Sequence, residues 1–405
     1  MLHIQRPSGE ELTAVRSEDI KDARALKEHF CEVYGYPVYL QQLLHDADLL
    51  KDGEKLDASM NLHLVLLSLS GVSDSQNAAL RFAQADMKDA AQRNRVGVLQ
   101  RLLEAGIDKD SSGCDGRTAL MHAALQGRRE VAHLLMQAGA RKDCWGNDGM
   151  TALMTASVFG RVEVARSLLE AGAARDCWDH SGMTALMLAA LHGHLEATDL
   201  MLQAGADAEC RDDSSRTALL FACASGHFQV ARLLLEAGVE KDCRDNDGTT
   251  ALMHASLKGY LGVAVLMLKA GADKDCRDND GKTALMRVCL TGRLDSARLL
   301  LEAGADRDCG DNQGRTALML VALRGRLESA RFLVQAGAEK DCRDHEDRTA
   351  LMLASGSGYV DVARLLLEAG ADKDCCSHDG MTARLLASSN GHFMVVRLLR
   401  QAGAI

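Results

Sequence analysis

Eight regularly spaced cysteines are the residues of this sequence that most suggest chemistry. Each follows an aspartate or a glutamate, and they recur at a constant interval of 33 positions. Thiolates beside carboxylates could bind metal ions or form a redox ladder. However, segments that pack side by side lie roughly 10 Å apart, which exceeds the ~7 Å Cα separation of a disulfide and the ~2.3 Å of a zinc–sulfur bond. We therefore expect no metal and no cofactor. Residues at the same position of successive 33-residue intervals are called a column here, and we interpret the cysteine column as small, partly buried residues: Cys144, Cys177, Cys210, Cys243, Cys276, Cys309, Cys342 and Cys375.

Two short motifs resemble ligand-binding loops without completing them. Gly281-Lys282-Thr283 matches the end of a phosphate-binding loop, but Cys276 stands where that loop has its first glycine. Residues 245–248, Asp-Asn-Asp-Gly, match part of a calcium loop that lacks its first ligand and its closing glutamate. Neither Gly-x-Ser-x-Gly nor His-Glu-x-x-His occurs. We interpret both motifs as turns and predict that the protein is not an enzyme.

The composition favours helices built from small apolar residues. Hydrophobic residues make up 47% of the chain but aromatic residues only 3%, and Pro7 and Pro37 are its only prolines, where average usage would give about twenty. Alanine, leucine, valine and methionine must then build the core. This composition disfavours a β-sandwich and leaves few aromatic side chains to stack on nucleic-acid bases.

A repeat of constant length organises most of the chain. Thr-Ala recurs nine times in steps of 33, from Thr118 to Thr382, and Ala-Gly recurs ten times in the same register, from Ala105 to Ala402. Ten repeats therefore fill roughly residues 76–405. Stacked repeats contact only their neighbours, so the array counts as a single domain despite its length.

Each repeat is predicted to contain a turn and two helices. In one repeat, Gly248 supplies the positive φ of a tight turn, Thr250 stands at the N-cap of an inner helix, and Gly271 ends an outer helix. Neither helix could bury its apolar face alone, so stacking must supply the core. Ser215 and Asp347 stand where the other turns have glycine, and we expect mild turn strain near Ser215.

These features resemble the ankyrin repeat, a 33-residue unit that begins Thr-Pro-Leu-His-x-Ala. The resemblance covers about 330 of the 405 residues and implies a mainly α-helical solenoid that binds proteins. Alanine replaces the family's proline, and methionine replaces its histidine in most repeats, so the hydrogen bond between threonine and histidine is missing. We expect the methionines to fill the core: Met121, Met154, Met187, Met253, Met286, Met319 and Met352.

Residues 1–75 do not follow the repeat. Apolar residues around a Pro-Ser-Gly turn predict a hairpin within residues 2–15. Helical spacing predicts a helix over residues 18–33 with Ser17 as its N-cap. Strands after Pro37 would complete a small α+β domain.

Parts of this segment resemble the β-grasp fold of ubiquitin, namely Gln-Gln-Leu-Leu at 41–44, Leu-x-Asp-Gly-x-x-Leu at 50–56 and Leu-His-Leu-Val-Leu at 62–66. The resemblance implies a module that docks to ubiquitin-pathway or proteasome factors through a patch formed by Leu44, His63 and Val65.

We therefore predict a β-grasp domain over 1–70, a linker over 71–76 and a repeat array over 77–405. The first repeat (77–110) and the last (377–405) would serve as caps. Arg384 replaces a leucine of the other repeats, which predicts a polar outer face for the last repeat.

Columns that vary between repeats are expected to carry the function. By the ankyrin resemblance, turn residues, the residue before the threonine and the end of the inner helix form a concave binding face. Both tryptophans of the protein lie in one such column. Exposed aromatic residues and methionines are typical of interface hot spots; alternatively, each tryptophan packs on its neighbouring turn. The predicted protein-binding residues are Trp145, Met150, Val158, Phe159, Trp178, Met183, Leu191 and His192.

Basic residues occupy these columns in the later repeats. They could form a groove for an acidic peptide, or the aspartates that flank each arginine in Cys-Arg-Asp could neutralise them, which is the better-supported interpretation. The Lys-Asp pairs before the cysteines are expected to be solvated charges that contribute little. The basic residues are Arg211, Arg216, Arg244, Arg277, Lys282, Arg315, Arg324, Arg343 and Arg348.

The charge pattern limits the partners. The formal charge is −10, with both signs spread along the chain, which argues against binding to nucleic acid or to anionic membranes. No apolar run approaches the roughly 20 residues of a membrane span, and the odd number of cysteines with no export signal favours a reduced compartment. We expect a monomeric cytoplasmic or nuclear adaptor without membrane insertion. The alternatives are a recognition subunit or regulator of a ubiquitin ligase, and a cytoskeletal or membrane-protein tether.

Overall fold

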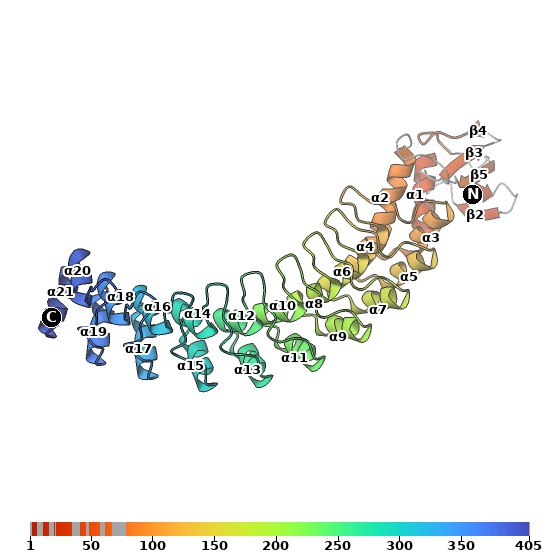
Figure 1. Ribbon diagram of the computed structural model, residues 1–405. Coiled ribbons are helices and arrows are strands. Elements are labelled where there is room, and N and C mark those ends of the chain that lie inside the picture. Colours follow the sequence, from red (N-terminus) through yellow and green to blue (C-terminus); the bar gives the residue numbers. More distant parts are fainter. Residues whose placement is uncertain are drawn as a thin grey trace. The chain divides into compact units, whose positions relative to one another are not determined.

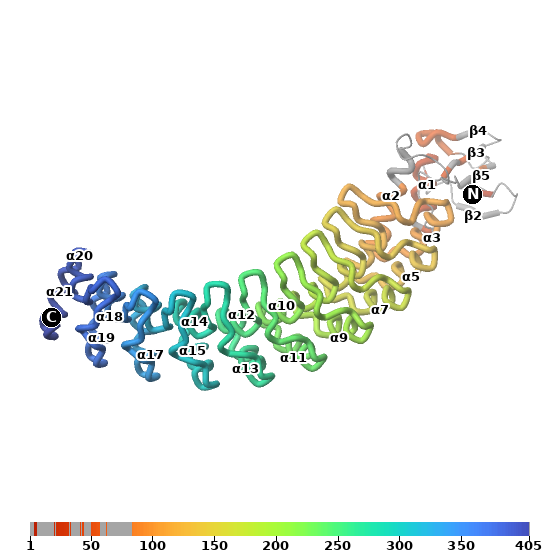
Figure 2. The backbone as a smooth tube through the Cα atoms, in the orientation of Figure 1, coloured from red at the N-terminus to blue at the C-terminus, as the bar shows by residue number. Residues whose placement is uncertain are grey.

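The computed structural model describes residues 2–5, 11–15, 20, 22–34, 41–45, 48–56, 61–66 and 78–404; Figure 2 traces the backbone. Ser17 and the predicted linker, residues 71–76, lie outside the described residues. Contacts divide the chain into two compact parts. The first part comprises residues 1–189 and 196–206, and the second comprises residues 190–195 and 207–405.

The first part contains a five-stranded sheet. Strands β1 (Leu2–Gln5) and β2 (Glu11–Val15) form the predicted antiparallel hairpin. β1 also pairs in parallel with β5 (Asn61–Leu66), and β5 pairs antiparallel with β3 (Gln41–His45), next to which β4 (Asp48–Leu49) forms the edge. The strand order is therefore β2-β1-β5-β3-β4.

Helix α1 (Ala23–Tyr34) shares a core with this sheet. Its Leu26 and Phe30 are fully buried together with Leu43 of β3 and Leu62 of β5. The helix begins later than the predicted residue 18, because Oδ1 of Asp22 accepts the backbone N–H of Ala25 at 2.8 Å and acts as a cap.

The rest of the described chain consists of helix pairs, one pair in each repeat (Figure 1). The inner helices are α2 (Ala78–Gln92), α4 (Ala119–Gln126), α6 (Ala152–Val158), α8 (Ala185–His192), α10 (Ala218–Ser225), α12 (Ala251–Lys258), α14 (Ala284–Thr291), α16 (Ala317–Leu323), α18 (Ala350–Gly356) and α20 (Ala383–Ser389). The outer helices are α3 (Val96–Glu104), α5 (Arg129–Gln137), α7 (Val162–Glu170), α9 (Leu195–Gln203), α11 (Phe228–Glu236), α13 (Leu261–Lys269), α15 (Leu294–Glu302), α17 (Leu327–Gln335), α19 (Val360–Glu368) and α21 (Phe393–Gln401).

Threonine caps the inner helices as predicted. For example, Oγ1 of Thr283 accepts the backbone N–H of Met286 at 3.4 Å, which satisfies a donor in the first turn of α14. The side chain of Met286 is 1% exposed, and the other six methionines of the column are equally buried. The prediction that methionine fills the core is confirmed.

The turns have the expected backbone geometry. Gly248 and Gly271 have φ values of 75° and 78°, and Ser215 and Asp347 adopt the same left-handed region at 60° and 58°. Side chains are disfavoured in this region, so the two substituted turns carry backbone strain.

Polar side chains connect successive repeats. The amide of Asn279 donates to the carbonyl oxygen of Asn246 at 2.7 Å. Oδ1 of Asp242 accepts the backbone N–H of Asp273 at 3.0 Å, and a similar bond joins Asp275 to Asp306 at 2.9 Å. The aspartates before the cysteines were predicted to be solvated charges that contribute little; their carboxylates also satisfy backbone donors of the next repeat.

The last repeat exposes apolar side chains. Leu385, Phe393 and Met394 are 42%, 78% and 64% exposed. The polar outer face that Arg384 suggested is therefore wrong, because a single polar substitution on α20 leaves these apolar neighbours uncovered.

Candidate protein-binding groove

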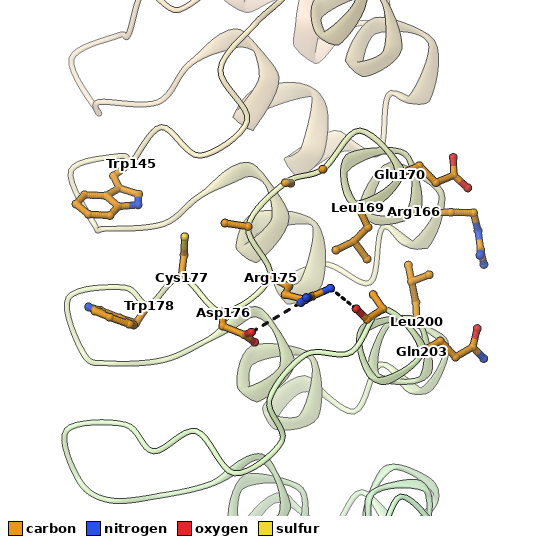
Figure 3. A pocket seen from close by; sticks show the side chains of 14 residues that line it. Trp145, Arg166, Leu169, Glu170, Arg175, Asp176, Cys177, Trp178, Leu200 and Gln203 are labelled. Atoms are coloured by element: carbon orange, nitrogen blue, oxygen red, sulfur yellow. Dashed lines mark hydrogen bonds and ion pairs between the residues drawn. The ribbon is translucent and has the colours of Figure 1, made fainter.

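Trp145 and Trp178 line one groove of about 880 Å³ in the first part of the chain. Figure 3 shows both indoles on loops, with Leu169 and Leu200 across the groove from them. The tryptophans are 64% and 67% exposed, so neither indole is buried against its neighbouring turn.

The local backbone explains why the two tryptophans share this groove. Helix α7 ends at Glu170, and Gly172, with a φ of 81°, turns the chain into the loop that carries Trp178. Oδ1 of Asp143 accepts the backbone N–H of Ala174 at 2.9 Å, which ties the loop before Trp145 to the loop before Trp178. The two loops therefore stack in register and bring together residues that are one repeat apart in sequence.

The opposite wall comes from the C-terminal halves of two outer helices. Helix α7 contributes Leu169, and α9 contributes Leu200, which is 7% exposed. Exposed polar and charged side chains of the same helices stand at the rim: Arg166, Glu170 and Gln203. An apolar centre with a polar rim is the arrangement found at protein interfaces.

Charged groups between the two tryptophans and the helical wall also line the groove. The guanidinium of Arg175 lies 3.9 Å from the carboxylate of Asp176 and donates to the carbonyl oxygen of Ala204 in the next repeat. Burial, together with the charges of Asp143 and Asp176, raises the pKa of the Cys177 thiol. This shift favours the neutral thiol over the thiolate, which is the nucleophilic form of cysteine.

A second, smaller hollow of about 620 Å³ shares Trp145 with the groove. Its lining is more polar and includes Asp110 and Arg141, whose charged groups lie 3.6 Å apart. Trp145 therefore stands between two hollows, whereas Trp178 borders only the larger one among those described.

The other predicted binding residues are not among those that line this groove. Phe159 is the C-cap residue of the inner helix α6 and is 46% exposed, and Met183 is 9% exposed. Met150 and Val158 are half-buried. Leu191 and His192 belong to the second part of the chain.

Sequence reasoning missed the helical wall of the groove. Leu169 and Leu200 lie at the ends of outer helices that we had interpreted only as core elements. A usable signal existed, because Arg166 and Glu170 flank Leu169 at helical spacing and mark the edge of an exposed face.

The motifs that resembled ligand loops are turns of the repeat. Gly281 has a φ of 80°, Lys282 pairs with Asp280 at 2.6 Å, and Thr283 caps α14. In the other motif, Asp245 accepts two backbone N–H groups of its own turn and lies 2.8 Å from Nε2 of His254. Within the described ranges, no cluster of three or more histidine, cysteine or acidic side chains could hold a metal ion.

Basic residues before the threonines are paired within their own turns. Arg216 lies 2.7 Å from Asp212, Arg315 lies 2.7 Å from Asp311, and Arg348 lies 2.9 Å from Asp344. These arginines are therefore neutralised within their own turns, a pairing that was predicted only for the arginines of Cys-Arg-Asp.

The predicted patch on the N-terminal domain is described only by its backbone. Leu44 of β3 pairs with His63 of β5, and Gln42 pairs with Val65. The side chains of Leu44, His63 and Val65 lie outside the described part of the structure.

Comparisons with known proteins agree with the repeat architecture. The chain matches a family model described as ankyrin repeats (3 copies) over residues 87–177, 138–212, 186–278, 258–344 and 336–405. The solved structures that match include the ankyrin repeat domain of Bcl-3, a member of the IkappaB protein family. It is 31% identical, with a TM-score of 0.48, and the match covers 51% of this chain and 94% of that one. No curated protein matches the chain.

Proposed function

The chain belongs to the ankyrin-repeat family, and on this basis we propose that it is a non-catalytic scaffold that binds a partner protein in the groove between Trp145 and Trp178. Ankyrin repeats are interaction modules, so a protein partner follows from the family. The place of binding rests on one observation: the only two tryptophans of the chain are both largely exposed and line the same groove.

The energetics of binding favour this surface. Tryptophan is enriched among the residues that carry most of the binding energy at interfaces. Each indole offers a large apolar area with few rotatable bonds, so ordering it on binding costs little entropy. A partner that covers both indoles would also cover Leu169 and gain further apolar burial.

A capture experiment tests this proposal. The wild-type chain and the double variant Trp145→Ala/Trp178→Ala are used as baits, and the retained proteins are compared. The double variant Phe393→Ala/Met394→Ala is the matched control, because it also removes two large exposed apolar side chains. Loss of a partner from the tryptophan variant alone supports the proposal, whereas an identical set of partners for all three baits contradicts it.

We also propose that residues 1–70 are a β-grasp module that docks the scaffold to ubiquitin-pathway or proteasome factors. The parallel pairing of β1 with β5 and the packing of α1 on the sheet core support this proposal, because they combine a central parallel pair with a helix across one face. The register that pairs Leu44 with His63 also supports it, since the two residues stand directly opposite each other on neighbouring strands.

Proximity labelling of the full chain tests the docking role. The triple variant Leu44→Ala/His63→Ala/Val65→Ala should lose ubiquitin-pathway or proteasome neighbours and keep those that depend on the groove. If the lost neighbours are ligase subunits, the scaffold acts within a ligase complex. An unchanged set of neighbours, or a set of cytoskeletal and membrane proteins alone, contradicts the docking role. Among the described residues, no helix is both long and apolar enough to cross a bilayer.

A further inference from the structure

Three arginines form a row along successive repeats in the second part of the chain. Arg211, Arg244 and Arg277 each follow a cysteine of the regular column, and all three are exposed. We call them the arginine row. They occupy the sequence column that holds the two tryptophans in earlier repeats.

Each guanidinium in the row is held by the next repeat. Arg211 donates to Sγ of Cys243 at 3.4 Å, Arg244 donates to Sγ of Cys276 at 3.7 Å, and Arg277 donates to Sγ of Cys309 at 3.0 Å. A thiol is a weak, neutral acceptor. These contacts therefore orient the arginines at the spacing of the repeats without neutralising their charge.

The aspartate directly after each arginine of the row contacts a different side chain. Asp212 pairs with Arg216 at 2.7 Å, Asp245 lies 2.8 Å from His254, and Asp278 lies 3.4 Å from Arg287.

The acidic residues that precede the row are also engaged. Asp242 and Asp275 accept backbone N–H groups of the following repeats, and Glu209 accepts from the thiol of Cys243. Across the described residues, no member of the row forms an ion pair with a carboxylate. The expected neutralisation by flanking aspartates is thus wrong for these three arginines.

The row has a defined length. Gly310 occupies the next position of the column and supplies no side chain, and Arg343 beyond it lies 4.0 Å from Asp347. Three exposed guanidinium groups, one in each of three successive repeats, therefore lack an ion pair among the described residues, and the row has a gap after the third.

The spacing of the row selects one kind of ligand. Stacked helical repeats are about 10 Å apart, and a polyproline II segment advances about 9 Å in each turn of three residues. Carboxylates at every third position would therefore meet successive arginines from one side of the ligand. A β-strand does not fit, because residues three apart point to opposite faces.

From this geometry we propose that the arginine row binds an extended acidic protein segment in the polyproline II conformation, with a carboxylate at every third residue. Guanidinium groups bind carboxylates through paired, charge-assisted hydrogen bonds. The site is independent of the groove at Trp145 and Trp178, so either proposal can fail without the other.

A fluorescently labelled peptide, (Glu-Pro-Pro)4, tests the proposal against the full chain by anisotropy. The control peptide has the same composition with its glutamates contiguous. We expect the spaced peptide to bind at least fivefold more tightly than the control, and its affinity to fall as salt is added. Equal affinity for the two peptides would contradict the proposed match between the spacing of the arginines and that of the ligand's carboxylates.

Charge-matched variants identify the site. Arg211→Gln/Arg244→Gln/Arg277→Gln should weaken binding of the spaced peptide about tenfold or more, since three exposed pairs are lost. Arg232→Gln/Arg298→Gln/Arg331→Gln removes the same charge from exposed positions on outer helices and should leave the affinity unchanged. Equal losses in both variants would overturn the site. The proposal would also be overturned if the spaced peptide fails to bind and an oligothymidylate binds in a way that depends on the arginine row.

Discussion

Trp145 and Trp178 stand one repeat apart in sequence, yet both line one groove and leave 64% and 67% of their surface exposed. Folding does not require this exposure, because other repeats place arginine or glycine in the same column. Large apolar side chains left in solvent without a structural need mark interaction surfaces. The pair therefore links the repeat architecture directly to the proposed function.

The turn glycines give a test of how tightly neighbouring repeats approach each other. A Cβ at Gly281 would collide with the backbone nitrogen and side chain of Asn312 in the next repeat, whereas no described atom lies within 4 Å of a Cβ at Gly238. Both glycines have positive φ values, 80° and 83°, so alanine is strained at either position by about 1–2 kcal/mol. Chemical denaturation should show a free-energy loss of about 3 kcal/mol or more for Gly281→Ala and only the smaller, backbone loss for Gly238→Ala. Equal losses would contradict the close approach of the two turns.

His122 should make the stability of the first part depend on pH. Burial and the nearby charge of Lys88 lower its pKa from 6.5 to about 4, although Asp115 at 3.8 Å acts in the opposite direction. The folded state therefore binds fewer protons than the unfolded state between pH 6.5 and 4, and stability falls as the pH is lowered through this window. His122→Leu, which installs the residue that several other repeats have in this column, should flatten the dependence. A variant that retains the full slope in denaturation midpoints measured from pH 7 to 4 would exclude His122 as its source.

The methionine column should tolerate a change of shape but not a loss of volume. Met286 is 1% exposed and packs in the core. Truncation to alanine leaves a cavity and should cost about 2–5 kcal/mol, whereas Met286→Leu should cost less than about 1.5 kcal/mol. Leucine already occupies this column at Leu220. Urea unfolding of the two variants measures the difference, and a similar cost for both would argue against a packing role.

Much of the repeat fold could be predicted because its determinants are local. Threonine caps, turn glycines and the constant repeat length each act within one repeat. The role of Thr283 as a helix cap and that of Gly248 as a turn residue could therefore be predicted from the sequence. Met183 and Trp178 were less predictable, since both stand in columns expected to be exposed, yet one is buried and the other is not. Whether a side chain is buried in a stacked array depends on which side chains of the neighbouring repeat cover it. The position of a residue within its own repeat does not specify those side chains.

The pairing of charged side chains was also hard to predict from the sequence. Arg216 and Arg211 are five positions apart in one turn, but Arg216 pairs with Asp212 while Arg211 reaches a thiol of the next repeat. Asp212 directly follows Arg211 in sequence, yet its carboxylate pairs with Arg216, four positions further on. Neutralisation was predicted for Arg211, which stands in Cys-Arg-Asp, whereas the structure shows the ion pair at Arg216.

The central claim is that a partner protein covers the two indoles, and fluorine NMR of the full chain labelled with 5-fluorotryptophan tests it most directly. The chain contains only two tryptophans, so two resonances are expected, assignable with Trp145→Phe and Trp178→Phe. When a captured partner is added to saturation, the account predicts that both resonances shift and become less sensitive to solvent exchange between H2O and D2O. A partner that binds with both resonances unmoved would contradict the account.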